Sequence, residues 1–262
     1  MADKNQSGDM ITFLGTGGAR IMVSNQILAS GGLWLKLGGT EILIDPGPGC
    51  IVQSTKHKLR ADKLGAIILS HRHLDHSADI NIMVEAMTQG GFRQRGWLFA
   101  PADALKTEPV IFSYLKDYLE GIEILQEGKS YSVGNVSFAT PVRHLHPVET
   151  YGLLFKTPEY SFSYIADTLY FDGLLHSYKS ELLIINLVLL EPRPGIDHLS
   201  VANAEHIIAQ VKPKVAILTH FGMNVWRARP WEIAQRLSKE SGVRVIAARD
   251  GMRFDLKQLA ND

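Results

Sequence analysis

The segment Leu69-Ser70-His71-Arg72-His73-Leu74-Asp75-His76 places three histidines and one aspartate within six residues. An apolar run, Ala66–Leu69, leads into it and is typical of a buried strand. The residues that follow, 75–88, carry apolar side chains at helical spacing. Histidines and a carboxylate at the end of a strand, where a loop presents its side chains, predict a functional site.

The spacing inside this segment determines which side chains can meet. His71 and His73 are two residues apart, so in extended backbone they face the same side and converge on one point. Asp75 and His76 come where the chain turns into the helix, and they can address a second point nearby. Neutral imidazoles and carboxylates are good ligands for zinc, manganese or iron. The segment therefore predicts a metal-binding site.

A site for two metals needs more ligands, and later parts of the chain supply them in order. His146 lies in a second histidine-containing segment, and Asp167 and His220 each follow directly on a β-type run. Residues at strand ends of a sheet protein can meet at one edge. His144 is the rival of His146 as a ligand, and the spacing to Gly152 favours His146.

This order of residues resembles the metallo-β-lactamase fold superfamily, and the early segments 11–18 and 44–49 match that family as well. The resemblance extends from Met10 to about Met252. It implies an α/β fold, an αββα sandwich of two mixed β-sheets with outer helices, and two divalent metals at one edge. Zinc or manganese is expected there, with iron as the alternative.

The resemblance also assigns roles to the candidate ligands. The ligands of one metal would be His71, His73 and His146. The ligands of the other would be Asp75, His76 and His220. Asp167 would bridge the two metals, and Asp45 would hold ligand histidines in place from behind. Flavodiiron oxidoreductases of this fold carry Glu at the position of His73, so the histidine here favours hydrolysis.

Two metals a few ångströms apart can share a water and lower its pKa enough to give hydroxide near neutral pH. Asp75 and His198 are the residues on which we expect catalysis to depend. The segment Asp197–Ser200 resembles the phosphodiesterase branch of the superfamily, in which a histidine at the position of His198 contacts phosphate or acts as general acid. Alternatively, His198 caps the helix expected over 201–211.

The choice within that branch depends on what the chain lacks. Transfer-RNA 3′-processing ribonucleases (ribonuclease Z) usually have a His-Glu-Ala-Thr motif where this chain has Ile185-Asn186-Leu187-Val188, and their long Gly/Pro-rich arm is not found either. The chain looks more like the phosphoribosyl cyclic phosphate phosphodiesterases. Some of those carry a Cys-rich zinc site, which Cys50 alone cannot form. A small cyclic phosphate or sugar-phosphate diester is the expected substrate. A transfer-RNA endoribonuclease and a non-catalytic metal-binding protein are the alternatives.

Four arginines are candidates for contacting substrate phosphate through bidentate hydrogen bonds. They are Arg72, Arg93, Arg95 and Arg193. Two of them lie in the loop 90–96, which is rich in glycine. A solvated surface position is an equally good interpretation.

Composition limits the remaining possibilities. The chain has 262 residues, 45% of them apolar and 21% charged, which excludes intrinsic disorder and fits a single domain over 1–262. The 27 basic and 27 acidic residues cancel, which argues against a broad surface for nucleic acid or anionic lipid.

No apolar run is long enough to span a membrane. The polar N-terminus and the lone Cys50, expected to be a buried packing residue, favour a reduced cytoplasmic location. Oligomeric state stays open, with a homodimer among the options.

Overall fold

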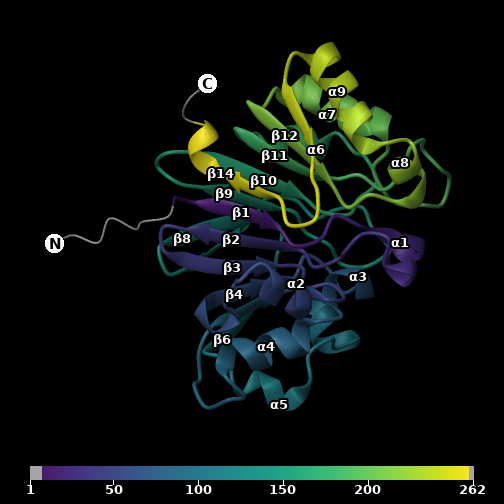
Figure 1. The fold of residues 1–262 in the computed structure, drawn as a ribbon. Coiled ribbons are helices and arrows are strands. Elements are labelled where there is room, and N and C mark those ends of the chain that lie inside the picture. Colours follow the sequence, from purple (N-terminus) through teal and green to yellow (C-terminus); the bar gives the residue numbers. More distant parts are fainter. Residues whose placement is uncertain (1–7, 260–262) are drawn as a thin grey trace.

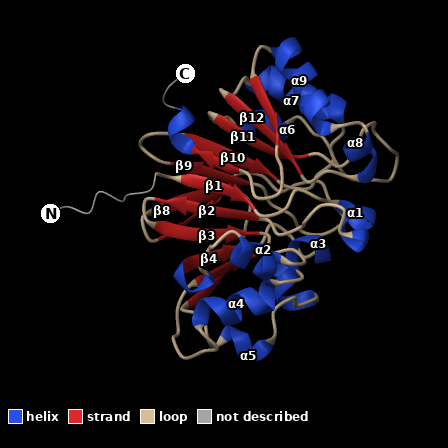
Figure 2. Cartoon of the chain, in the orientation of Figure 1, coloured by secondary structure: helices blue, strands red, loops and turns tan. Residues whose placement is uncertain are grey.

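A computed structural model describes residues 8–259. Two seven-stranded β-sheets pack face to face, and helices cover the outer surface of each (Figures 1 and 2). The first sheet has the order β14 (Arg253–Asp255), β1 (Met10–Phe13), β2 (Leu33–Leu37), β3 (Thr40–Ile44), β4 (Leu64–Ile68), β5 (Trp97–Ala100) and β6 (Gly121–Ile124). The second has the order β13 (Arg244–Ala247), β12 (Val215–Thr219), β11 (Leu182–Asn186), β10 (Ser161–Ile165), β9 (Leu153–Lys156), β8 (Val136–Thr140) and β7 (Lys129–Val133).

The helices divide between the two outer faces (Figure 1). Those beside the first sheet are α2 (Cys50–Lys56), α3 (Leu74–Ser77), α4 (Ile80–Thr88) and α5 (Ser113–Lys116). Those beside the second are α6 (Gly173–Ser177), α7 (Val201–Val211), α8 (Met223–Arg227) and α9 (Pro230–Ser241). Helix α1 (Ala19–Asn25) lies at the edge where the two sheets meet. Short helical turns occupy Ala61–Lys63, Asp103–Thr107 and Leu256–Leu259. The predicted αββα sandwich is confirmed.

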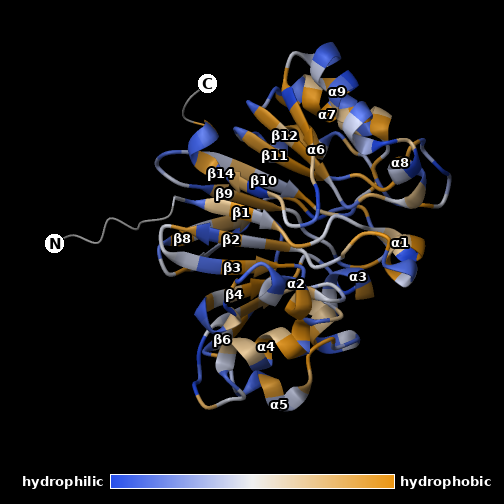
Figure 3. Ribbon diagram, in the orientation of Figure 1, coloured by the Kyte–Doolittle hydropathy of each residue, from blue (hydrophilic) through white to orange (hydrophobic). Residues whose placement is uncertain are grey.

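Three apolar layers hold the sandwich together. The layer between the sheets contains stacked aromatic rings, with Phe155 and Phe162 centroids 4.5 Å apart, and burying such a side chain stabilises the fold by about 1.5–3 kcal/mol. The other two layers lie between each sheet and its helices. Strands β11 and β12 are buried on both faces and hydrophobic along their length (Figure 3). Cys50 is fully buried in the layer beneath α2, as expected.

Several predicted elements match the structure closely. The first three strands pair antiparallel, as expected. Only β2 and β3 are joined by a short turn, and the connection from β1 to β2, where turns without a helix were expected, contains helix α1. The helix predicted over 75–88 is instead divided into α3 and α4, because the Asp79 N–H bonds to the Pro46 carbonyl between them. The run 182–190 forms a strand only as far as Asn186. Strands β6 and β14 are three or four residues long and were not expected.

The direction of the strands determines where the polar loops gather. β3, β4 and β5 are parallel in one sheet, as are β10, β11, β12 and β13 in the other. Their carboxyl ends point to the same edge of the sandwich (Figure 2). Among residues 8–259, none of the helices has the length and hydropathy to cross a bilayer. The single domain predicted over 1–262 includes residues 1–7 and 260–262, which lie outside the described part.

Candidate metal centre

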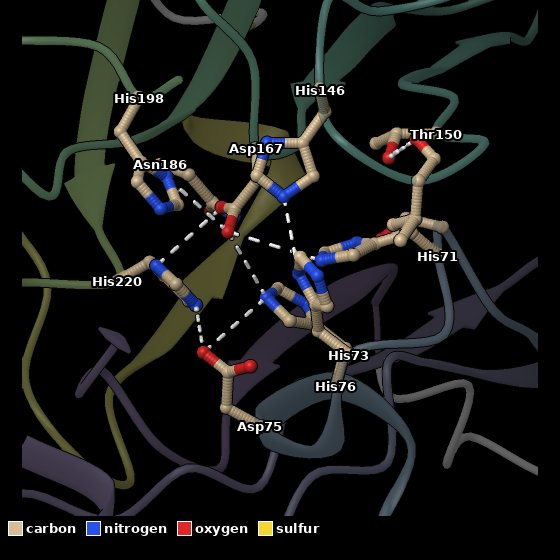
Figure 4. A network of polar contacts seen from close by, with 12 residues as sticks. His71, His73, Asp75, His76, His146, Thr150, Asp167, Asn186, His198 and His220 are labelled. Atoms are coloured by element: carbon tan, nitrogen blue, oxygen red, sulfur yellow. Dashed lines mark hydrogen bonds and ion pairs between the residues drawn. The ribbon is translucent and has the colours of Figure 1, made fainter. Parts of the chain in front are cut away.

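The predicted ligands come from the loops that follow three of these parallel strands and from one further connection, and they converge on one spot (Figure 4). The loop after β4 carries the segment 71–76, the carboxyl end of β10 leads to Asp167, and that of β12 leads to His220. His146 comes from the connection between β8 and β9. The structure therefore brings together side chains that are up to 149 positions apart between His71 and His220.

Three histidines form the first group of donors. One ring nitrogen from each of His71, His73 and His146 lies within 4.8 Å of the others, and His146 Nε2 is 3.1 Å from His73 Nδ1. The His146 Nδ1–H donates to the Asp197 carbonyl at 2.9 Å. Because a carbonyl can only accept, this bond leaves the Nε2 lone pair of His146 free to bind a cation.

The second group combines one carboxylate with two histidines. Donor atoms of Asp75, His76 and His220 lie within 4.8 Å of one another, and His220 Nε2 is 3.4 Å from Asp75 Oδ2. His220 adopts a left-handed backbone with φ of 58°, a conformation that costs energy and recurs at functional sites. Gly18 permits this arrangement, since a Cβ there would lie 2.0 Å from the His220 ring.

Asp167 lies between the two groups. Its Oδ2 is 3.9 Å from His71 Nε2 and 3.5 Å from His76 Nε2. Its Oδ1 is 3.5 Å from His220 Nδ1. A carboxylate whose Oδ2 lies near a histidine of each group has the placement of a ligand that two cations can share.

Asp45 supports the histidines from behind. Its Oδ2 accepts hydrogen bonds from His76 Nδ1 at 3.0 Å and from the Ser70 hydroxyl at 2.7 Å. The Ser70 oxygen in turn lies 3.0 Å from His71 Nδ1. Since Ser70 gives its proton to Asp45, it accepts the proton of His71, and the Nε2 atoms of His71 and His76 face the site. Asp45 is itself left-handed, with φ of 53°.

Two further residues belong to this network and were not predicted. Asn186 Nδ2 donates to Asp167 Oδ1 at 2.8 Å and to the Tyr164 hydroxyl at 3.1 Å. The Tyr164 hydroxyl donates to Asp45 Oδ2 at 2.9 Å. Tyr164 lies in β10 and Asn186 is the last residue of β11, and neither position is marked as part of a site by a motif in the sequence. The one signal at Asn186 was a polar residue interrupting an apolar run.

His144 and His146 differ in what their nitrogens contact. His144 Nδ1 donates to the Asp167 carbonyl at 3.3 Å, and its Nε2 is 2.8 Å from the Tyr178 hydroxyl. Both nitrogens are thereby occupied, whereas His146 keeps one free. A Cβ on Gly152 would come within 2.5 Å of the same Tyr178 oxygen, which explains a glycine at this spacing.

Buried nitrogen atoms without partners test whether these residues fit metal ions. Among residues 8–259, nine buried side-chain N or O atoms lack a hydrogen bond, and five of them belong to His71, His76, His198 and His220. An unpaired buried polar atom costs about 1–3 kcal/mol. Nitrogen and carboxylate donors that face one another without partners fit divalent cations.

The protonation states favour the same interpretation. Burial lowers the pKa of His71, and it lowers the pKa of His73 to about 4, so both rings are neutral and can offer lone pairs at pH 7. Burial alone would also lower the pKa of His76, but the carboxylates of Asp75 and Asp167 raise it. The negative charge of Asp75 and Asp167 that raises the pKa of His76 could equally be balanced by a bound cation.

His198 lies beside the shared carboxylate. Its Nδ1 is 3.4 Å from Asp167 Oδ2, and its ring centroid is 5.2 Å from that of His146. It does not cap α7, because the Ser200 hydroxyl accepts the Asn203 N–H in a capping box. Burial lowers the pKa of His198, against the opposing effect of Asp167.

The four candidate arginines do not gather at this centre. Arg72 bonds to Asp103 at 3.0 Å and pairs with Glu108. Arg95 donates to the carbonyls of Asp62 and Leu64, at the opposite end of β4. Arg93 is exposed and lines an open groove at that same end. Arg193 is exposed on the loop that leads to His198.

Comparison with known proteins agrees with this geometry. Residues 40–221 match the family model described as the beta-lactamase superfamily domain. An uncharacterised protein of Methanocaldococcus jannaschii is 30% identical over 254 residues, covering 94% of each chain. Ribonuclease Z of Sulfolobus acidocaldarius is 31% identical over 128 residues, covering 48% of this chain and 42% of that protein.

Solved structures show the same fold. The metallo-beta-lactamase fold protein YhfI from Bacillus subtilis superposes with a TM-score of 0.79 and 22% identity, covering 95% of this chain and 99% of that one. A diphosphatase from the PhnP family superposes with a TM-score of 0.71 and 19% identity, covering 94% and 96%. The chain therefore belongs to the beta-lactamase superfamily, a family of metal-dependent hydrolases with the metallo-beta-lactamase fold.

Proposed function

We propose that the protein is a phosphodiesterase that uses two divalent metal ions, zinc or manganese with iron as the alternative, to hydrolyse a small cyclic phosphate or a sugar-phosphate diester. The observation that carries this proposal is the position of Asp167 between two complete groups of donors. Cations bound there would supply a nucleophilic water near neutral pH and offset negative charge on phosphate oxygens.

The chain's own residues then have separate tasks. Asp45 and the Asp197 carbonyl keep His76 and His146 in the tautomer whose Nε2 faces the site. The Ala19 N–H donates to Asp75 Oδ2 at 3.2 Å and restricts that carboxylate. These contacts hold the donors in place before substrate arrives, which lowers the cost of reaching the reactive geometry.

His198 is the proposed partner of the phosphate and its leaving oxygen. It lies next to Asp167 yet belongs to neither donor group. As a neutral imidazole it keeps one N–H to donate to a phosphate oxygen. The negative charge of a bound phosphodiester would raise its pKa and allow it to protonate the departing alkoxide.

A small substrate is favoured over a polynucleotide by the balance of charge in the chain and by the pairing of Arg72. Arg72 is engaged by two carboxylates, and the equal numbers of acidic and basic residues provide no excess of positive charge. Binding of transfer RNA depends on such an excess. The second candidate, a transfer-RNA 3′-processing endoribonuclease, is favoured by the relatives named ribonuclease Z.

The test is an activity panel on protein loaded with zinc or manganese. It contains bis-p-nitrophenyl phosphate, a ribose 1,2-cyclic phosphate and a precursor transfer RNA, with Asp75→Ala as the inactive reference. We expect hydrolysis of both small diesters and its loss in Asp75→Ala. Cleavage of the precursor RNA alone, with a steep salt dependence, would support the second candidate. Metal-loaded protein that is inert on every substrate would instead favour a non-catalytic metal-binding protein.

A further inference from the structure

One hydrogen-bonded network connects ligands that belong to different metal positions. Asp45 Oδ2 is its centre, and one arm runs through Ser70 to His71 in the first group. A direct bond joins Asp45 to His76 in the second group. The two groups of donors are thus attached to the same buried carboxylate.

A second arm reaches the ligand that lies between the groups. The Tyr164 hydroxyl donates to Asp45 and accepts from Asn186, and the other N–H of Asn186 donates to Asp167. Each direction follows from chemistry, because carboxylates can only accept. The amide of Asn186 therefore has its nitrogen toward Asp167 and Tyr164.

This second arm is shielded from solvent and held by paired strands. Asp45, Tyr164 and Asn186 are each 4% exposed or less. Tyr164 lies in β10 and Asn186 ends β11, and these strands pair in parallel. Asn186 also pairs with Thr219, directly before His220. In such a low-dielectric setting hydrogen bonds are strong and polarise one another, so a fully satisfied network holds its members rigidly.

We propose that Tyr164 and Asn186 are positioning residues that couple the loading of the two metal positions, an inference that rests on the proposed dinuclear site. They connect Asp167 to Asp45, which in turn holds His71 and His76. A cation in either position would order Asp167, this arm would pass that order through Asp45 to the histidines, and a second cation would then meet ligands that are already arranged. Binding to a protein that is already ordered costs less entropy, which produces positive cooperativity.

The experiment is a titration of metal-free protein with Zn²⁺ or Mn²⁺, followed by calorimetry and by competition with a chromophoric chelator. Tyr164→Phe removes only the hydroxyl, and Asn186→Leu replaces the amide with an apolar group of the same branched shape, so the two variants remove the arm at two different points. Tyr131→Phe is the matched control, because its buried hydroxyl bonds to Gln126 and Ile124 at a distance from the metal centre. Circular dichroism checks that each variant is folded.

We expect wild type and Tyr131→Phe to take up two ions in one cooperative step. Tyr164→Phe and Asn186→Leu should show two separate steps, the weaker with an affinity reduced by about 10-fold to 100-fold, as is usual when a residue behind a ligand is removed. If Asn186→Leu does not fold, Tyr164→Phe carries the test alone. Titration curves that superpose on wild type in both folded variants would overturn the proposal.

Measuring diester hydrolysis on the same samples separates this inference from the proposed function. Split titration curves with an inactive wild type would leave the coupling intact and refute the phosphodiesterase. If wild type is active and both variants still take up the two ions in one step, the phosphodiesterase is supported and the coupling is refuted. Uptake of a single ion by wild type would overturn both the coupling and the dinuclear site.

Discussion

The two ends of the paired sheets differ in whether their buried polar atoms have hydrogen-bond partners. At the carboxyl ends of β4 and β12, buried histidine nitrogens without hydrogen-bond partners face one another and the Asp167 carboxylate that follows β10. At the other end of β4, an open groove of about 740 Å³ contains a comparable set of charged residues, and none of its described polar atoms is buried without a partner. That groove is lined by Glu41, Lys63, Arg93, Arg95 and Glu120.

The contrast shows which feature marks a binding centre in this molecule. Charged residues occur at both ends, but Arg95 in the groove is already committed to two backbone carbonyls. The histidines have their outer nitrogens fixed by Asp45 and Asp197 while their inner nitrogens remain available. The candidate metal centre therefore differs from the groove in its buried nitrogen atoms that lack hydrogen-bond partners, and not in the number of its charged residues.

The largest effect that would sharpen this contrast is expected at His198. Replacing His198 with Ala removes a donor at the phosphate, and we expect kcat to fall by about 10²-fold to 10⁴-fold. Steady-state kinetics on bis-p-nitrophenyl phosphate measures this, together with metal content. A matching substitution at the groove, Glu120→Ala, should leave kcat unchanged. Full activity of His198→Ala protein that still binds two metals would show that His198 has no role in the reaction.

Removing metal should destabilise the folded protein. Each ion present at 100 times its dissociation constant stabilises the native state by about 2.7 kcal/mol, roughly 5–10 °C in Tm for a protein of this size. Thermal unfolding with and without a chelator measures the shift. His76→Ala should lose most of it. An equal shift in wild type and His76→Ala would place the stabilising ion elsewhere.

Acid should destabilise the metal-free protein through its buried neutral histidines. Burial lowers the pKa of His144 from 6.5 to about 4. Between pH 4 and pH 6.5 the imidazole of His144 is protonated in the unfolded chain and neutral in the folded chain. The contribution of the neutral His144 to stability is therefore complete above pH 6.5 and is lost as the pH falls toward 4. His76, whose pKa is raised, acts in the opposite direction.

Urea unfolding in chelator at pH 6.5 and 4.5 isolates the His144 contribution when wild type is compared with His144→Gln. We expect wild type to lose about 2 kcal/mol more than the variant over this interval. Parallel losses in the two proteins would show that His144 accepts a proton in the folded state.

The smallest effect is expected at the groove. Arg95→Ala removes two hydrogen bonds to backbone carbonyls and should lower the free energy of unfolding by about 1 kcal/mol. Both Arg95→Ala and Arg93→Ala should keep kcat/KM within about twofold of wild type, as surface changes away from a site usually do. A large rise in KM for either variant would contradict this expectation and show that the loop 90–96 contacts the substrate.

The sequence was most informative where residues act through local spacing. His71, His73, Asp75 and His76 are neighbours in the chain, so their convergence follows from backbone geometry. The contributions of His146, Asp167 and His220 were predicted from the strand ends and from resemblance to a family, because no local rule brings them together.

The parts that could not be predicted depend on how the strands pair. Tyr164 and Asn186 meet because β10 and β11 are parallel and in register, and in the sequence both look like ordinary core positions. Arg95 was a plausible phosphate ligand until the direction of β4 placed its guanidinium at the far end. Asp79 divides the predicted helix through a single backbone bond to Pro46.

The central claim is that seven side chains from four segments of the chain form one centre for two metals. Crystals of the protein grown with Zn²⁺ or Mn²⁺, and measured at the absorption edge of the metal, test it directly. The account predicts two anomalous peaks, one among His71, His73 and His146 and one among Asp75, His76 and His220, with Asp167 between them. A single peak, or peaks that lie away from Asp167, would contradict it.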